Sequence, residues 1–226
     1  MKNLTLIFIA GLFLASCGTT TQTKFNAYPA MYDDRQPLSV LVIPAINKTT
    51  AADATDYFNV TITEPLSNSG YYTMPVEIVK DIFLKEGVVD STMIKGLPTS
   101  IFRKNFGVDA VLFVTINAWD KNYAIVAGNV TVSMEYVMLS TDSSEIIWQY
   151  SASQVVDTTA NSSGFIIADL ISTALTTATT DYVPIAKQVN YQAFTGLPHG
   201  NYSTLHRTDA QQAILVTLKD AATDVE

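Results

Sequence analysis

Residues 109–119 read DAVLFVTINAW, a strongly apolar run rich in the β-branched and aromatic residues that favour strands. Two further runs follow, at residues 123–139 and 146–156, and both alternate apolar and polar side chains as a half-buried strand does. The links at residues 119–123 and 141–145 are short and polar, as hairpin connections are. The sequence therefore predicts a three-stranded antiparallel meander.

Strand and helix patterns alternate before the meander, and helical patterns follow it. The expected earlier strands are Leu38–Ile43 and Tyr71–Met74. The expected helices are Asp53–Ser67 with Tyr57, Val60 and Thr61 on one face, Val76–Lys85 with Ile78, Val79, Ile82 and Phe83 facing the core, Ser91–Lys95, Thr99–Phe106, Gly164–Lys187 interrupted near Pro184, and Thr208–Lys219. The order β-α-β-α-β-β-β-α predicts an α/β (α+β) fold, with a single mixed β-sheet and helices packed on it.

The N-terminus has the pattern of a bacterial lipoprotein signal. Lys2 provides a positive charge, an apolar run spans Leu4–Leu14, and LASC at residues 14–17 matches the lipobox, in which small residues precede a cysteine that is acylated. We predict a signal peptide at residues 1–16, cleavage before Cys17, and attachment to the membrane through acyl chains, palmitate among them, on Cys17. Two or three chains anchor stably. Because Gly18 rather than Asp follows Cys17, envelope sorting rules favour the outer membrane.

Residues 17–37 are predicted to be the lipidated cysteine and a flexible tether, because Thr19–Thr23 is polar and Pro29 and Pro37 discourage regular structure. Residues 38–226 are long enough for a single domain with its own core. The net charge of −8 argues against nucleic acid as a partner, since phosphate binding needs clusters of Lys and Arg.

The search for catalytic chemistry in the sequence finds no complete motif. Walker, Gly-x-Gly-x-x-Gly, Gly-x-Ser-x-Gly and Ser-x-x-Lys patterns are absent, and the two histidines, His199 and His206, stand in no local catalytic pattern. We interpret the acidic pair at residues 33–34 as solvation of the tether rather than a calcium site, because the EF-hand spacing is missing. The sequence predicts no enzyme, no cofactor and no metal site.

Aromatic residues gather on the expected strands. Packing in the core is one interpretation, and an exposed aromatic patch for a protein partner is the other, because interfaces are enriched in Tyr and Trp. The candidate partner-binding aromatics are Tyr71, Tyr72, Trp119, Tyr123 and Trp148.

Several stretches resemble a lipoprotein family of unknown function typified by a genome-derived neisserial antigen. They are VIPAIN at residues 42–47, PLSNSGYYTMPV at 65–76, FGVDAVL at 106–112, Ile147-Trp148, and GLPHGNY at 196–202. Ala45 and Val108 depart from the family pattern, which has proline and alanine there. The resemblance implies a fold similar to the periplasmic domain of the curli-secretion lipoprotein and to lipoprotein activators of penicillin-binding proteins, and it implies no catalytic residue.

We therefore expect a membrane-anchored envelope lipoprotein that faces the periplasm and acts without catalysis, as an adaptor or assembly component that binds an envelope protein. The alternative is a homo-oligomeric subunit of a secretion-type complex. A minor alternative is a cell-wall hydrolase that uses His199 or His206.

Overall fold

The computed structural model describes residues 19–123, 128–157 and 182–217. The helices are α1 (Lys24–Ala27), α2 (Ala54–Asn68), α3 (Val76–Lys85), α4 (Ser100–Phe106) and α6 (Val183–Phe194), with the short 3-10 helices η1 (Pro29–Met31) and η2 (Ser91–Met93). The strands are β1 (Thr19–Thr23), β2 (Ser39–Val42), β3 (Ile46–Asn47), β4 (Tyr72–Thr73), β5 (Ala110–Tyr123), β6 (Gly128–Ser140), β7 (Ile146–Asp157) and β8 (Ala213–Thr217).

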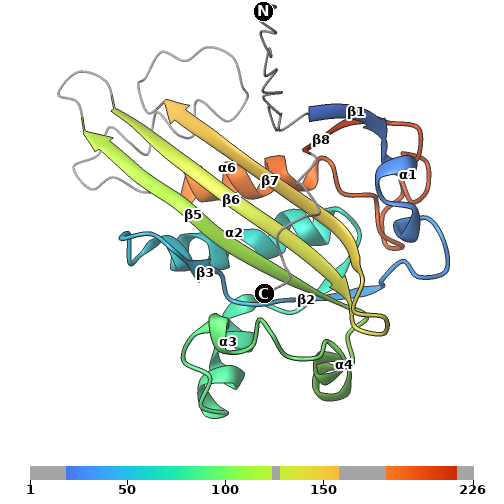
Figure 1. Ribbon diagram of the computed structural model, residues 1–226, viewed down its shortest axis with the longest axis horizontal. Helices are drawn as coiled ribbons and strands as arrows, with labels where there is room; N and C mark the ends of the chain where they lie inside the picture. The colour runs from blue at the N-terminus through green and yellow to red at the C-terminus, as the bar shows by residue number, and fades with distance from the viewer. Residues whose placement is uncertain (1–18, 124–127, 158–181, 218–226) are drawn as a thin grey trace, which may run out of the picture.

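The main sheet is mixed and has the strand order β4-β2-β5-β6-β7, with β3 also paired to β5 (Figure 1). Strands β4, β2, β3 and β5 run parallel, whereas β5, β6 and β7 form the antiparallel meander. The predicted α/β (α+β) class with a single mixed main sheet is therefore confirmed.

The two faces of β5 are buried in two separate cores, because successive strand residues point to opposite faces. Leu112 and Val114 belong to the larger core, which α2 and α6 cover. Val111 and Phe113 belong to a smaller core with residues of α3 and α4. A buried polar contact fixes α6 on the larger core, since Tyr136 Oη lies 2.8 Å from Asn190 Oδ1.

Helix α3 has the predicted bounds, and the other early elements match within a few residues. The predicted inner faces are partly wrong, because Val60 is 57% and Ile78 is 49% exposed. The predicted turn at residues 119–123 is also wrong, since β5 continues to Tyr123 and pairs with β6 through Gly128. Polar residues there are compatible with a strand whose outer face meets solvent.

The C-terminal predictions need two corrections. Helix α6 runs to Phe194 rather than ending at Lys187, and Pro184 lies in its first turn, where a missing N–H costs nothing. The rest of the expected helix, residues 164–181, lies outside the described residues. The expected helix Thr208–Lys219 is wrong: residues 208–212 form turns and Ala213–Thr217 is strand β8, whose apolar, β-branched run has a strand partner in β1.

The expected flexible tether is wrong for residues 19–37. Strand β1 pairs antiparallel with β8, and the Lys24 side chain that follows is 1% exposed. The threonine-rich run that looked like a polar linker is β-branched, which suits a strand once a partner is present. Within the described residues, none of the helices has the length and apolar character needed to cross a bilayer.

Candidate functional site

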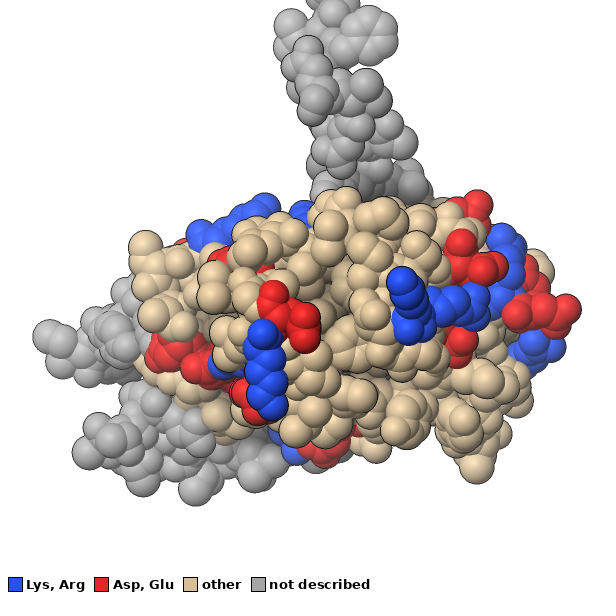
Figure 2. Space-filling model, turned by 90° about the horizontal axis from the view of Figure 1, so that it is seen from below, with Lys and Arg blue, Asp and Glu red and all other residues tan. Residues whose placement is uncertain are grey.

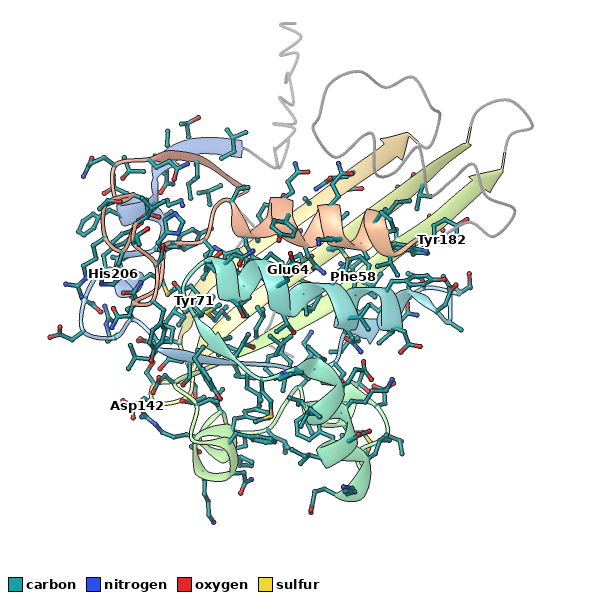
Figure 3. All side chains as sticks on the ribbon, turned by 180° about the vertical axis from the view of Figure 1, so that it is seen from behind. Phe58, Glu64, Tyr71, Asp142, Tyr182 and His206 are labelled. Atoms are coloured by element: carbon teal, nitrogen blue, oxygen red, sulfur yellow. The ribbon has the colours of Figure 1, made fainter. Side chains whose placement is uncertain are left out.

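A charged groove lies at the end of the main sheet where β6 turns into β7. Its volume is about 440 Å³, and it is formed by the segment before β2, helix α4, the start of β5, the β6–β7 turn and the C-terminal turn. The charged residues that line it are Asp33, Asp34, Arg35, Arg103, Asp109, Asp142 and Arg207. Figure 2 shows basic and acidic side chains intermixed at one end of the molecule, and Figure 3 places Asp142 toward that end.

Asp109 builds the floor of the groove by joining β5 to β2. Its Oδ2 atom accepts hydrogen bonds from the backbone N–H of Leu38 and Ser39, both at 3.1 Å, and from Ser39 Oγ at 2.9 Å. Gly107, with φ of 69°, ends α4 in the left-handed conformation just before this aspartate. In the stretch FGVDAVL, Gly107 therefore ends helix α4, and Asp109 then acts as a clamp, because its hydrogen bonds hold the start of β5 to the start of β2.

We expect Asp109→Ala to destabilise the domain by about 2–3 kcal/mol, because hydrogen bonds to a charged acceptor contribute about 1.5–3 kcal/mol and the backbone N–H groups of Leu38 and Ser39 lose their partner. Asp142→Ala is the matched control, since Asp142 is 82% exposed and its pair with Arg103 is worth less than about 1 kcal/mol. Urea unfolding of both variants gives the two free energies. Equal effects would contradict the role of Asp109 as a clamp.

Two arginines of the groove, Arg35 and Arg103, are held by carboxylates but remain open to solvent. Arg103 lies between Asp142 at 2.9 Å and Asp109 at 3.4 Å. Arg35 contacts Asp33 through Nε at 2.9 Å and Nη2 at 2.6 Å. The hydrogen bond from Arg35 is the main cause that lowers the pKa of Asp33. Because these side chains are exposed, each ion pair contributes little to stability and can be exchanged for a partner's charge.

The C-terminal side of the groove depends on a close backbone contact between Gly70 and Gly200, which we call the joint. Gly200 N–H donates to the Ser69 carbonyl at 2.8 Å, and Tyr202 N–H donates to the Gly70 carbonyl at 3.1 Å. Tyr71 Oη donates to the Pro198 carbonyl at 2.6 Å. The stretches at residues 65–76 and 196–202, which are about 120 residues apart in the chain, thus fold as one unit. We identified both stretches from the sequence but did not predict their contact, because neither stretch contains a local pattern that indicates which distant segment it packs against.

The candidate aromatic patch is wrong as an exposed surface. Tyr71 is 2%, Trp119 3% and Trp148 0% exposed, so these three rings are core residues. Trp148 stacks on the ring of Tyr150 at 6.4 Å between centroids. Tyr72 alone of the candidates whose side chains are described is exposed, at 64%. Tyr123 ends β5, and its side chain lies outside the description, as does Cys17.

The two histidines lie in the C-terminal turn beside the joint, and Figure 3 shows His206 there. His199 Nδ1 is 3.5 Å from Ser203 Oγ, and His206 Nδ1 is 3.2 Å from the His199 carbonyl oxygen. The nearby carboxylate of Asp209 accepts the backbone N–H of His199 rather than a ring N–H. A Ser-His-Asp relay needs the carboxylate on the ring, so the described residues assemble none. They also contain no group of three or more potential metal ligands among His, Cys, Asp and Glu.

The family model of GNA1162-like lipoproteins matches residues 27–203, which include the meander, the joint and nearly all of the groove. The chain belongs to the GNA1162-like lipoprotein family. The resemblance inferred from the short stretches is confirmed.

Two neisserial relatives support the assignment. Lipoprotein NMB1124/NMB1162 of Neisseria meningitidis serogroup B is 27% identical over 172 residues, which cover 76% of this chain and 79% of the relative. The crystal structure of lipoprotein GNA1162 from Neisseria meningitidis superposes with a TM-score of 0.52 at 27% identity, covering 62% of this chain and 95% of that one. A more distant likeness is to the PelC dodecamer from Paraburkholderia phytofirmans, with 12% identity, a TM-score of 0.48 and coverage of 81% and 98%.

One departure from the GNA1162-like pattern has a structural reason. Ala45 stands where the family pattern has proline, and its backbone N–H donates to Asn59 Oδ1 at 3.0 Å. A proline has no N–H and could not make this bond. The alanine therefore ties the turn after β2 to helix α2.

Proposed function

We propose that this protein is an outer-membrane lipoprotein, acylated on Cys17 after removal of residues 1–16, that binds an envelope protein in the periplasm through its charged groove. It acts by binding and not by catalysis. The observation that carries the proposal is the groove itself, where Arg35 and Arg103 are paired with carboxylates yet exposed to solvent, and the exposed Arg207 donates to the Asp33 backbone carbonyl. Membership in a lipoprotein family supports the location in the envelope.

The charge pattern of the groove suits a protein partner. Arg35, Arg103 and Arg207 alternate with carboxylates, so the surface offers both signs within one cavity. Such a pattern attracts a partner with the complementary arrangement of charges and repels a partner with like charges at the same places. The result is specific and fast association. A phosphate backbone would meet the carboxylates of Asp33, Asp34 and Asp142, so nucleic acid is disfavoured.

The test is photo-crosslinking in living cells with a reactive side chain introduced at Ser143, which lines the groove and is exposed. We expect heterologous envelope proteins to be trapped. The variant Arg103→Glu should reduce capture about tenfold or more, equivalent to about 1.4 kcal/mol, because it replaces attraction by repulsion.

Lys104→Glu is the matched control for Arg103→Glu. Lys104 is the next residue of α4, is exposed, and does not line the groove, although the change in charge is the same. Equal loss in both variants would show a general charge effect and would refute binding through the groove. Crosslinks only between copies of the chain would refute the adaptor and favour the homo-oligomeric alternative.

A further inference from the structure

Strand β1 begins at Thr19, only two residues after Cys17. A chain of two residues spans at most about 7 Å, whatever its conformation. A flexible tether over residues 18–37 would instead have given a typical separation of about 25 Å. If Cys17 carries acyl chains, the folded body begins at the membrane surface rather than at a distance from it.

The two-stranded β1–β8 ribbon, residues 19–23 and 213–217, is fixed to this body. All five residues of β1 pair with β8. Ile214 packs against the larger core, and the chain directly after β1 is held by the buried Lys24 side chain, which donates to the Leu197 carbonyl at 3.0 Å. The ribbon therefore cannot swing away from the body without breaking buried contacts.

The outer face of the ribbon is uncharged, and it combines threonines with one large exposed apolar side chain, that of Leu215. Since Ile214 points to the core, its neighbours Ala213 and Leu215 point outward, and Leu215 is 71% exposed. Thr21 lies directly opposite Leu215 on the same face. Phe25, in the helix that follows β1, is 47% exposed. Neither strand contains a charged residue, although the whole chain carries a net charge of −8.

We propose that the outer face of the β1–β8 ribbon docks on the lipid surface, with Leu215 at the boundary between headgroups and acyl chains. This inference rests on the acylation of Cys17 in the proposed function. Because the protein is acidic, anionic lipids repel its charged surfaces, and they repel an uncharged face least. Exposed apolar side chains beside a lipid anchor also increase the affinity for the membrane interface.

Docking at the ribbon also sets the direction of the groove. Figure 1 shows β1 at the top of the molecule and the β6–β7 turn well below it at the same end, and Figure 3 labels Asp142 at that lower position. With the ribbon on the membrane, the β6–β7 turn and the charged groove beside it would stand clear of the lipid and remain open to a partner in solution.

The test uses the full acylated protein in vesicles of phosphatidylethanolamine and phosphatidylglycerol that contain a lipid-borne fluorescence quencher near the headgroups. Cys17 is the only cysteine of the chain and is blocked by acylation, so a fluorophore can be placed on Thr21→Cys alone. We expect strong quenching at position 21. A fluorophore on Ser143→Cys, in the groove, should remain unquenched.

A second pair of variants tests the contact itself. With the fluorophore at position 21, Leu215→Glu should lower the quenching, whereas Leu84→Glu should not, although Leu84 on α3 is exposed as well, at 47%. Protein that floats with the vesicles but is not quenched at position 21 would overturn docking by the ribbon and leave the lipid anchor intact. Protein that does not float with the vesicles would overturn the anchor and the docking together.

Discussion

Replacement of Gly200 by alanine is expected to destabilise the domain by about 4 kcal/mol or more, an effect seen only where a substitution meets a rigid obstacle. A Cβ at Gly200 would meet the Gly70 carbonyl oxygen at 2.3 Å and its carbon at 2.8 Å. At Gly70 it would meet Ser203 N at 2.5 Å. These are backbone atoms, so they cannot rotate aside, and relief requires the joint to open.

Alanine substitutions at four glycines distinguish the cost of a steric clash by the added Cβ from the cost of a positive φ. Gly96→Ala meets no atom within 4 Å and should be nearly neutral, and Gly107→Ala, with φ of 69° but no contact, should cost about 1–2 kcal/mol. Gly200→Ala has the contact, and Gly70→Ala has the contact and φ of 90°. Urea unfolding should rank them in that order. A Gly200 variant as stable as the Gly96 variant would refute the joint.

The meander and helix α3 could be predicted because their signals are local. Period-two alternation over ten or more residues identifies β6, and Pro75 before an apolar stripe identifies the start of α3. The side chains that face the core were less predictable. Val60 is apolar and lies one residue from a buried position, yet the final orientation of α2 depends on α6, which is more than 120 residues away.

The ribbon, the joint and the groove could not be predicted, because each depends on contacts between distant segments. Thr19–Thr23 has the composition of a linker and becomes a strand only because Ala213–Thr217 pairs with it. Asp33 was interpreted as solvation of a tether, whereas the folded chain places it beside Arg35 and Arg207. A single exposed aspartate carries no sequence signal for such a site. Gly70 and Gly200 belong to two of the stretches that resemble the family, and only the structure shows that they touch.

The proposed binding and docking surfaces are connected through one buried ion pair. Lys24 Nζ lies 2.9 Å from Asp209 Oδ2, and the two side chains are 2% and 7% exposed. Asp209 also accepts the Tyr32 hydroxyl at 3.1 Å and the His199 N–H at 3.2 Å. This carboxylate therefore ties the segment after the ribbon to the C-terminal turn that borders the groove.

Asp209→Ala is expected to destabilise the domain by about 3–5 kcal/mol, because it leaves the buried ammonium of Lys24 without its counter-charge. The double variant Lys24→Met with Asp209→Asn removes both charges and keeps an acceptor for His199, so it should be more stable than Asp209→Ala alone. Urea unfolding of both proteins measures the difference. A double variant less stable than Asp209→Ala would contradict the penalty for an unpaired charge.

The same carboxylate makes stability depend on pH. Burial acts to raise the pKa of Asp209, but the hydrogen bond and charge of Lys24, the His199 N–H and the Tyr32 hydroxyl outweigh it and lower the pKa below its usual value. A lowered pKa in the folded state means that the stabilisation is complete above the unfolded pKa of about 3.9 and is lost as pH falls through the folded value. The wild type should therefore lose stability below about pH 4 more steeply than the double variant. Protonation of Asp209 weakens its ion pair with Lys24, which holds the chain beside the ribbon. As the pH falls, the quenching of the fluorophore at position 21 should therefore change before the whole domain unfolds.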